Sequence, residues 1–298
     1  KGQTKYTAVD GSPALKEAVA AKFKRENNLD YTLDQLIVSA GGKQCFYNLA
    51  QSLLNPGDEV IIPAPFWVSY PDIVMLADAV PVIVFAGAEQ KFKISAEQLE
   101  QALSPMTKLF VLNSPNNPTG QAYTPQELAE FGRVLTRYPD VLLVTDDIYE
   151  HIFWQGKFQN IINVCPELYE RCIVINGVSK AYSMTGWRIG YAAGPKELIK
   201  AMKTLQSQST SNAASISQAA ALAALTGGHA FYTELCQTFK ARHDYIVQGL
   251  NSLPGVHCLP SAGTFYCFPD FSDSMEKRGF KDDAAFGEYI LNESLVAL

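Results

Sequence analysis

The alternation of short apolar segments with amphipathic ones constrains the fold of this chain more than any other feature of its sequence. Near-continuous apolar runs of strand length occur at residues 36–40, 59–62, 80–85, 108–113, 141–147 and 172–177. Helical patterns lie between them, such as the one that starts at Ser12 and Pro13. Strands that are apolar on both faces and alternate with helices are typical of a largely parallel sheet. We therefore predict an α/β fold with three layers, α/β/α, around a mostly parallel, buried sheet that binds ligands at the carboxyl ends of its strands.

The composition argues against several classes of partner. Lysine and arginine number 24 and the acidic residues 30, for a net charge of −6 without any basic run, so we expect neither nucleic acid nor an anionic membrane surface to bind. No apolar stretch reaches the roughly 18 residues that span a bilayer. The six cysteines lack metal-ligand spacing, which indicates buried thiols, a reducing cytoplasm and no metal site. These features favour a cytoplasmic enzyme that acts on small molecules.

The pattern of elements changes after about Ala230. One long helical pattern follows, and then short strand patterns around Val256 and at residues 264–268. We predict a large ligand-binding domain over residues 1–235 and the start of a smaller α+β domain over residues 236–298.

Polar residues gather at the ends of the predicted strands. The segments are GGKQ (41–44), PFWVSY (65–70), NSPNNPTG (113–120), DDIYE (146–150) and SKAYSMTGWRIG (179–190). Each alone fits an ordinary turn or a solvated surface. Asp146, however, ends a very apolar strand, where a carboxylate needs a cationic partner. The GGKQ turn precedes a helix whose first N–H groups suit a phosphate.

Taken together, the order, spacing and composition of these segments resemble the pyridoxal 5'-phosphate (PLP)-dependent aminotransferases of fold type I, class I and II. Within that family the chain is most similar to the bacterial-type aspartate aminotransferase subgroup, and the resemblance covers the whole sequence. Its most specific part is a lysine followed eight residues later by the arginine of GWRIG. The resemblance implies that Lys180 is the catalytic Schiff-base lysine and that Arg188 binds the cofactor phosphate.

Further cofactor-binding roles follow from the resemblance. Asp146 would pair with the protonated pyridine nitrogen, and its neighbour Asp147 is the competing candidate. Tyr149 and Asn117 would bond the ring oxygen. Trp67 would stack on the ring, although a tryptophan of the core is the rival interpretation.

Two segments connect the cofactor with the substrate and with a second subunit. Gly42 and Lys43 would contact the phosphate, and Lys43, with Trp67 and Asn117, would also bind substrate, the lysine near its distal carboxylate. Tyr6, in YTAVDG, resembles the residue that reaches the phosphate of a neighbouring subunit. The implied unit is a homodimer with shared active sites. Gly177 departs from the pattern, because many relatives carry a phosphate-binding serine there.

The implied function is transfer of an amino group between an acidic amino acid, foremost aspartate, and 2-oxoglutarate by a ping-pong mechanism through pyridoxamine phosphate. Several alternatives remain. They are an aminotransferase for prephenate or another amino acid, a PLP-dependent lyase and, more remotely, a regulatory domain that binds PLP without catalysis. A nicotinamide dehydrogenase ranks last, because GGKQ is not a GxGxxG fingerprint.

The resemblance also leads us to expect a chain that is truncated at both ends. The sequence starts at Lys1 and stops at Leu298 within an apolar, helix-like stretch. On this expectation the family's arginine for the substrate α-carboxylate lies beyond the sequence, so that the 298 residues alone would transaminate more slowly than a longer version.

Overall fold

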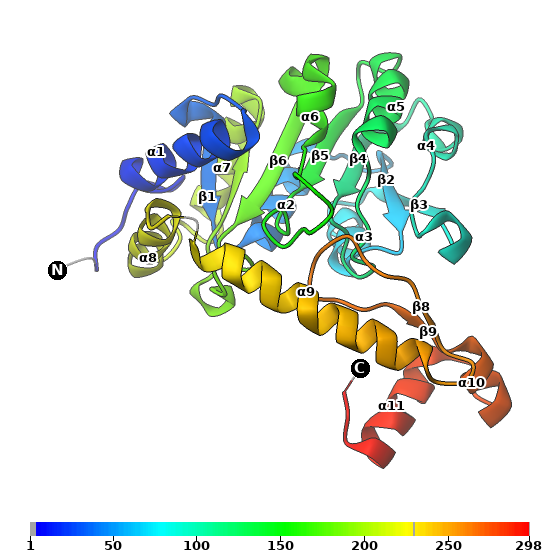
Figure 1. The fold of residues 1–298 in the computed structure, drawn as a ribbon. Coiled ribbons are helices and arrows are strands. Elements are labelled where there is room, and N and C mark those ends of the chain that lie inside the picture. The colour runs from blue at the N-terminus through cyan, green and yellow to red at the C-terminus, as the bar shows by residue number, and fades with distance from the viewer. Residues whose placement is uncertain (1–3, 229, 298) are drawn as a thin grey trace.

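The computed structural model describes residues 4–228 and 230–297 and contains a seven-stranded sheet flanked by helices on both faces (Figure 1). The strand order is β1-β7-β6-β5-β4-β2-β3. Its strands are β1 (Leu36–Ser39), β2 (Glu59–Ala64), β3 (Val80–Phe85), β4 (Thr107–Asn113), β5 (Leu142–Asp146), β6 (Cys172–Gly177) and β7 (Gly190–Ala193). Only β7 is antiparallel to its neighbours, β1 and β6. The predicted three-layer α/β fold is confirmed.

Helices form the outer layers. They are α1 (Pro13–Lys22), which continues as a π-helix (Phe23–Asn27), α2 (Gly42–Leu53), α3 (Ser69–Met75), α4 (Ala96–Ala102), α5 (Pro125–Thr136), α6 (Ile161–Val164), α7 (Lys196–Gln208) and α8 (Ser215–Thr226). Helices α2, α3 and α7 bury apolar residues in one core cluster, and α1, α4, α5, α6 and α8 bury theirs in another. Because strand residues alternate between the two clusters, the sheet separates them.

Two features of the sheet differ from the prediction. Strand β3 has the predicted bounds but is an edge strand, so Val80, Ile83 and Phe85 are exposed and the prediction that this strand is buried is wrong. Strand β7 was not predicted, because its four residues, Gly190–Ala193, are mostly too small to stand out as an apolar run.

The C-terminal part begins with the expected long helix, α9 (Ala230–Asn251), which crosses below the sheet in the view of Figure 1. It continues with β8 (His257–Cys258), β9 (Pro269–Asp270), α10 (Ser272–Arg278) and α11 (Asp283–Ser294). The strand predicted at residues 264–268 is wrong, since that segment is irregular and the strand follows it. The domain boundary at residue 235, a position inside α9, stays a prediction.

None of the helices described in residues 4–228 and 230–297 combines the length and apolarity needed to cross a membrane.

Candidate active site

A cavity of about 300 Å³ opens at the carboxyl ends of the parallel strands. It is lined by Gly42, Lys43, Trp67, Tyr70, Asn113, Asn117, Asp146, Ile148, Tyr149, Ser179, Lys180, Thr185 and Arg188. All but one of the residues predicted from the sequence to form the site therefore meet in one place. The exception is Tyr6, which is 91% exposed and does not line the cavity.

Asp146 presents a partly buried carboxylate to this cavity from the end of β5. The Tyr70 hydroxyl donates a hydrogen bond to its Oδ2 atom at 2.8 Å, and the Ile148 N–H donates to Oδ1 at 3.3 Å. Burial raises the pKa of Asp146, and the hydrogen bond from Tyr70 and the charge of Lys180 oppose that shift. A cation bound beside this carboxylate would remove the penalty of burial.

Asp147 faces away from the cavity. Asn160 donates a hydrogen bond to its Oδ2 atom at 2.6 Å, and burial raises the pKa of Asp147 to about 8, with the nearby Glu150 adding to the shift. At neutral pH this side chain is therefore mostly protonated and uncharged. The two neighbouring acids thus occupy opposite faces of the strand, and only Asp146 reaches the cavity.

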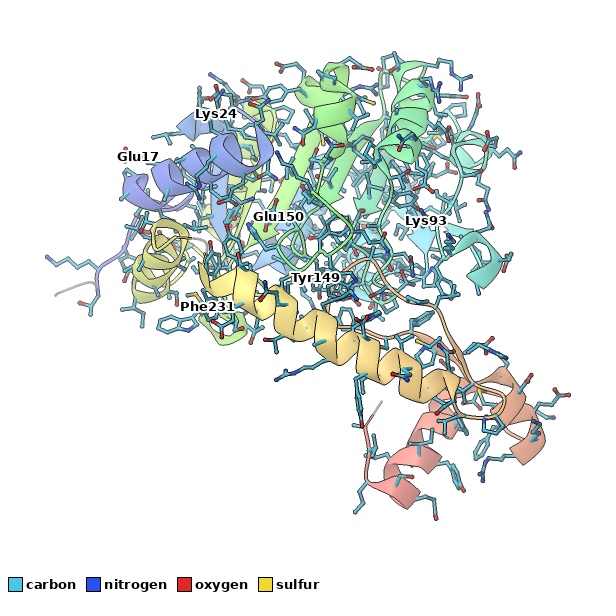
Figure 2. The ribbon with its side chains drawn as sticks, viewed as in Figure 1. Glu17, Lys24, Lys93, Tyr149, Glu150 and Phe231 are labelled. Carbon is cyan, nitrogen blue, oxygen red and sulfur yellow. The ribbon has the colours of Figure 1, made fainter. Side chains whose placement is uncertain are left out.

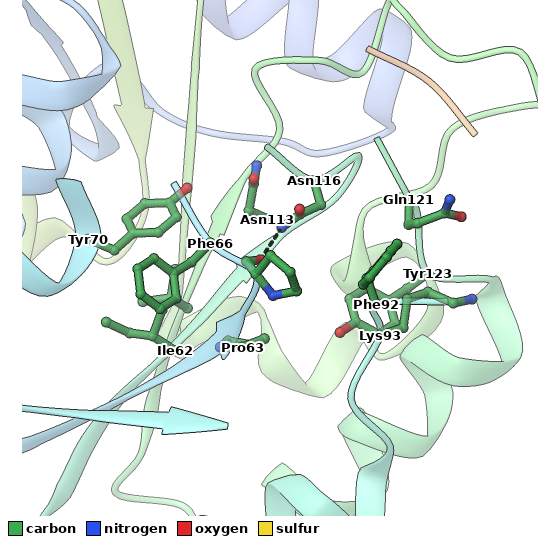
Figure 3. A pocket seen from close by; sticks show the side chains of 12 residues that line it. Ile62, Pro63, Phe66, Tyr70, Phe92, Lys93, Asn113, Asn116, Gln121 and Tyr123 are labelled. Carbon is green, nitrogen blue, oxygen red and sulfur yellow. Dashed lines mark hydrogen bonds between the residues drawn. The ribbon is translucent and has the colours of Figure 1, made fainter. Parts of the chain in front are cut away.

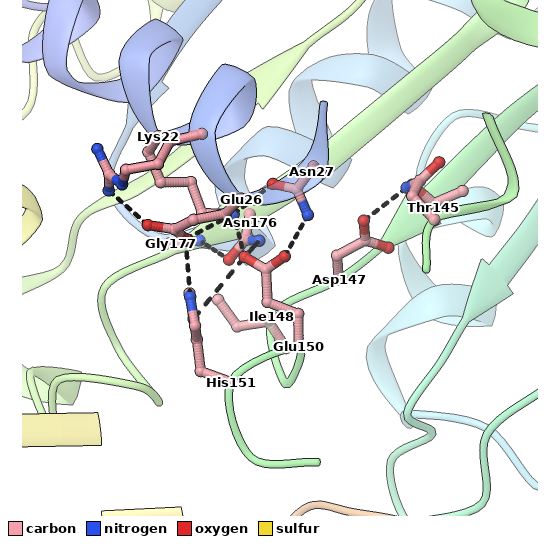
Figure 4. Close-up of polar contacts among 12 residues, drawn as sticks. Lys22, Glu26, Asn27, Thr145, Asp147, Ile148, Glu150, His151, Asn176 and Gly177 are labelled. Atoms are coloured by element: carbon pink, nitrogen blue, oxygen red, sulfur yellow. Dashed lines mark hydrogen bonds and ion pairs between the residues drawn. The ribbon is translucent and has the colours of Figure 1, made fainter. Parts of the chain in front are cut away.

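A buried ion-pair network secures the turn that carries Tyr149 (Figure 4). Lys22 pairs with Glu150 and donates to Asn27 at 2.7 Å, while Asn27 donates to Glu150 at 2.6 Å. A carboxylate oxygen of Glu26, one of Glu150 and a ring nitrogen of His151 lie within 4.8 Å of one another. The Lys22 ammonium lies within 3.7 Å of both carboxylates and balances their charge. The network ties α1 to the β5 loop.

Lys180 stands in the cavity among aromatic rings. Its Nζ atom lies 5.7 Å from the ring centroid of Tyr149 and 5.3 Å from that of Phe265. Burial lowers the pKa of Lys180, the charge of Arg188 lowers it further, and Asp146 opposes the shift. A lowered pKa increases the neutral fraction of the amine, which is the form that acts as nucleophile or base.

An anion-binding cradle forms where α2 approaches Arg188. The N-cap of α2 is Gly41, with φ of +95° and no side chain to bond the first N–H groups of the helix. The guanidinium of Arg188 donates to Ala40 O at 3.1 Å and to Thr185 O at 3.0 Å. A Cβ at Gly41 would lie only 2.2 Å from Arg188 Nη2, so glycine is needed for this close approach. Helix N–H groups and a guanidinium together suit a phosphate.

The departure noted at Gly177 has a steric reason. A Cβ at this position would lie 2.9 Å from the backbone oxygen of Ile189, in the neighbouring strand segment. A serine at 177 would therefore require the two strands to shift apart.

Aromatic and amide side chains complete the walls. Trp67 packs edge-on against Tyr70 with ring centroids 5.2 Å apart, and Lys43 Nζ lies 5.1 Å from the Trp67 ring centroid. Asn113 accepts a hydrogen bond from Asn117 N at 2.8 Å, which fixes the start of the NNPTG turn. Lys43 thus sits at the rim with its charge held over an aromatic face.

Several residues of the site were not predicted from the sequence. Tyr70 and Asn113 lie in two of the polar segments at strand ends without a predicted role of their own, although an aromatic hydroxyl and an amide at such places are signals for a site. Phe265 and Tyr266, which contact Tyr149, come from the C-terminal part and carry no local signal.

A second hollow shares Tyr70 and Asn113 with the main cavity (Figure 3). Its volume of about 10 Å³ is enough for roughly one water molecule. Lys93, at its edge, is bound to Glu127 at 2.6 Å. Of these two hollows, the larger one has room for an organic ligand.

Comparison with known proteins agrees with this geometry. The family model for aminotransferases of class I and II matches residues 1–298. The aspartate/prephenate aminotransferase of Nitrosomonas europaea is 51% identical over 303 residues, which cover 99% of this chain and 76% of the relative. The aspartate aminotransferase of Rhizobium meliloti is 46% identical, with 100% of this chain and 74% of the relative covered.

Solved structures give the same result. The crystal structure of the aspartate aminotransferase from Rhizobium meliloti matches with a TM-score of 0.94 at 45% identity, covering 99% of this chain and 76% of that one. The aspartate aminotransferase from Thermus thermophilus with maleate matches with a TM-score of 0.91 at 41% identity, covering 98% and 74%.

Proposed function

The chain belongs to the class I and II aminotransferases and has the fold of the aspartate aminotransferases, and from this premise we propose that it uses PLP to move the amino group of aspartate to 2-oxoglutarate. The observation that carries the proposal is that Lys180, Asp146 and Arg188 line one cavity of about 300 Å³. These residues supply the three groups that PLP requires: an amine for its aldehyde, a carboxylate for its ring nitrogen and a cation for its phosphate.

The residues present fit this cofactor. The partly buried Asp146 carboxylate has a raised pKa and gains from a cationic partner. The cradle of Gly41, the α2 N-terminus and Arg188 offers donors to an anion at the other end of the cavity. Trp67 can cover a ring face. Asn117 and Tyr149 are polar groups of this cavity that can bond a ring oxygen.

The chain's own residues then perform proton transfer and positioning. Bound PLP supplies an electron sink beside the substrate's α-carbon. Lys180, whose pKa is lowered, removes the α-proton at its Nζ atom and can return it to a neighbouring carbon. Asp146 keeps the ring nitrogen protonated, and Arg188 with the α2 N-terminus fixes the phosphate, so that the α C–H bond stays within reach of the amine.

The substrate class rests on charge. Lys43 lies at the cavity rim and presents its ammonium next to Trp67. The Nitrosomonas europaea relative is named for aspartate and prephenate, and the Thermus thermophilus structure is described with maleate. All three compounds carry two carboxylates, which a lysine at this place can recognise as a point charge. Prephenate is therefore the second candidate substrate.

The proposed reaction is tested by supplying PLP, aspartate and 2-oxoglutarate to the purified protein. Formation of glutamate at the rate of aspartate consumption supports amino transfer. A β-eliminating lyase would instead be identified by an amino acid that carries a leaving group on its β-carbon: cysteine would then release hydrogen sulfide, ammonia and pyruvate without formation of glutamate. Prephenate is a 2-oxo acid, so it is tested in place of 2-oxoglutarate as the amino acceptor, with aspartate kept as the donor. The ratio of the two kcat/KM values ranks the two acceptors.

Lys43→Ala is expected to lower kcat/KM for aspartate by roughly tenfold, about 1.4 kcal/mol, and to leave kcat/KM for alanine nearly unchanged. The reason is that only aspartate has a distal carboxylate for the ammonium to attract. Lys24→Ala is the matched control, because Lys24 pairs with Asp30 on the exposed surface. Equal losses with aspartate and alanine would mean that Lys43 has no role in specificity.

Gly41→Ala is expected to weaken PLP binding by tenfold or more, about 1.4 kcal/mol, because the added methyl group displaces the Arg188 guanidinium. Gly57→Ala is the control. Gly57 also has a positive φ, of +86°, but nothing lies within 4 Å of its Cβ position, so both variants carry backbone strain and only one disturbs the cradle. Fluorescence titration of the apoprotein with PLP measures the difference. If the two variants bound PLP with the same affinity, the assignment of Arg188 to the phosphate site would be wrong.

We also propose that two chains form a cytoplasmic homodimer in which Tyr6 completes the neighbouring site. The exposed position of Tyr6, 91% accessible, leaves its hydroxyl available to a second subunit, and all six cysteines are free thiols, which suits a reducing compartment.

A further inference from the structure

Residues 260–266 are docked on two loops of the cavity. The N–H groups of Ala262 and Gly263 both donate to Gly120 O, at 2.9 and 3.1 Å, and Thr264 N donates to Ile152 O at 2.7 Å. Trp154 N donates back to Ala262 O at 3.0 Å. These backbone hydrogen bonds join the C-terminal segment to the loop after β4 and to the turn after β5. The segment is thus a fixed wall of the site, although it is irregular.

Thr264 holds a strained backbone conformation within this segment. Its φ is +69°, which is rare for a β-branched side chain, and the residue is completely buried. Its hydroxyl accepts a hydrogen bond from Tyr266 N at 3.2 Å. The conformation turns the chain so that the two following aromatic side chains reach the cavity side of the segment.

Those two side chains surround Tyr149. The hydroxyls of Tyr266 and Tyr149 are hydrogen-bonded at 2.8 Å. Phe265 packs edge-on against Tyr149, with ring centroids 5.6 Å apart, and its own ring lies 5.3 Å from Lys180 Nζ. Tyr149 lies between the sheet and α9, as Figure 2 shows, and Phe239 of α9 packs on Phe265 with centroids 5.5 Å apart.

We propose that Tyr266 is a positioning residue of the aminotransferase: its hydroxyl donates to that of Tyr149 and so directs the single Tyr149 proton toward the ring oxygen of PLP. The inference rests on the proposed function. A phenol has one proton to donate, so Tyr149 can donate a hydrogen bond to the ring oxygen of PLP only if it accepts the hydrogen bond from Tyr266. A donor that itself accepts a hydrogen bond is polarised and donates more strongly.

The Tyr149 hydroxyl has several ionisable neighbours. They are Tyr266, Asp146 of β5, Tyr70 of α3 and Lys180 after β6. Burial raises the pKa of Tyr149, and the hydrogen bond with Tyr266 and the negative charge of Asp146 add to the shift. Tyr149 therefore remains a protonated donor across the pH range in which an enzyme of this kind is studied.

The test is a pH titration of the absorbance of the PLP-loaded protein. A hydrogen bond to the ring oxygen favours its anionic form, so losing it raises the midpoint of the titration. We expect Tyr266→Phe to raise the midpoint by about 0.3 pH unit and Tyr149→Phe by about 1 pH unit. In the double variant the midpoint should equal that of Tyr149→Phe, because Tyr266 acts through Tyr149.

Tyr123→Phe provides the control for the loss of a buried hydroxyl. The Tyr123 hydroxyl accepts from Ile94 N at 3.1 Å outside the main cavity, so its loss lowers stability without shifting the midpoint. An unshifted midpoint in Tyr266→Phe, or the same shift with and without Tyr149, overturns the assignment. A wild-type protein with no PLP absorbance band overturns the proposed function itself. A wild-type protein that shows the band and its titration, together with an unshifted midpoint in Tyr266→Phe, overturns this inference alone.

Discussion

Lys180→Ala is expected to lower the rate of amino transfer by at least about 10⁴-fold while the protein still binds PLP. Lys180 is the one amine among the described residues that lies in the cavity near both Asp146 and Tyr149. Its loss removes the base, but the phosphate cradle at Arg188 and α2 remains. Turnover of aspartate and equilibrium dialysis with PLP measure the two effects separately.

Two further variants make this result specific. Lys180→Arg keeps a positive charge but cannot be deprotonated, so it should be as inactive as Lys180→Ala. Lys196→Ala should retain full activity, because Lys196 pairs with Asp34 on the surface. Substantial turnover by either Lys180 variant would show that another group moves the proton.

Asp146→Asn is expected to lower kcat by about 10²–10³-fold, whereas Asp147→Asn should change it by less than about threefold. The first substitution removes the negative charge that faces the proposed ring nitrogen. The second replaces a side chain that is mostly neutral already, because burial and Glu150 raise the pKa of Asp147 to about 8. Both changes preserve shape, so the comparison isolates charge.

The pH dependence adds a check on this pair. Because the pKa of Asp147 is raised from 3.8 to about 8 on folding, the unfolded chain loses this proton at lower pH than the folded protein does, so the stability that the neutral carboxyl contributes is full below about pH 4, falls as the pH rises and is gone once the pH has passed about 8. Asp147→Asn should weaken this loss of thermal stability between about pH 4 and pH 8. Similar kcat losses in the two variants, or a larger loss in Asp147→Asn, would contradict the assignment of Asp146.

The sequence was sufficient to predict six of the seven strands of the main sheet and to predict that most of the candidate site residues lie together, for a physical reason. Apolar runs such as 172–177 become strands because the fold buries them on both faces, and polar residues at their ends meet at one edge of a parallel sheet. Asp146 and Lys180 end up together for this reason, although 34 positions separate them in the sequence.

What could not be predicted depends on tertiary position. The exposure of β3 follows from its place at the edge, which the run VPVIVF does not reveal. Residues 264–268 alternate like a strand, but Thr264 adopts a left-handed conformation because Ile152 and Gly120 hold the segment from two other loops. Tyr266 was missed for the same reason, since its partner Tyr149 lies in a distant part of the chain.

The most direct test of the account is to load the protein with PLP, reduce it with borohydride and map the modified peptide. Reduction fixes PLP to the lysine that carries it. The structure predicts a single label on Lys180, because this amine lies in the cavity between Asp146 and Arg188 and has a lowered pKa. A label on Lys43 or on any lysine outside the cavity, with Lys180 unmodified, would contradict the central claim.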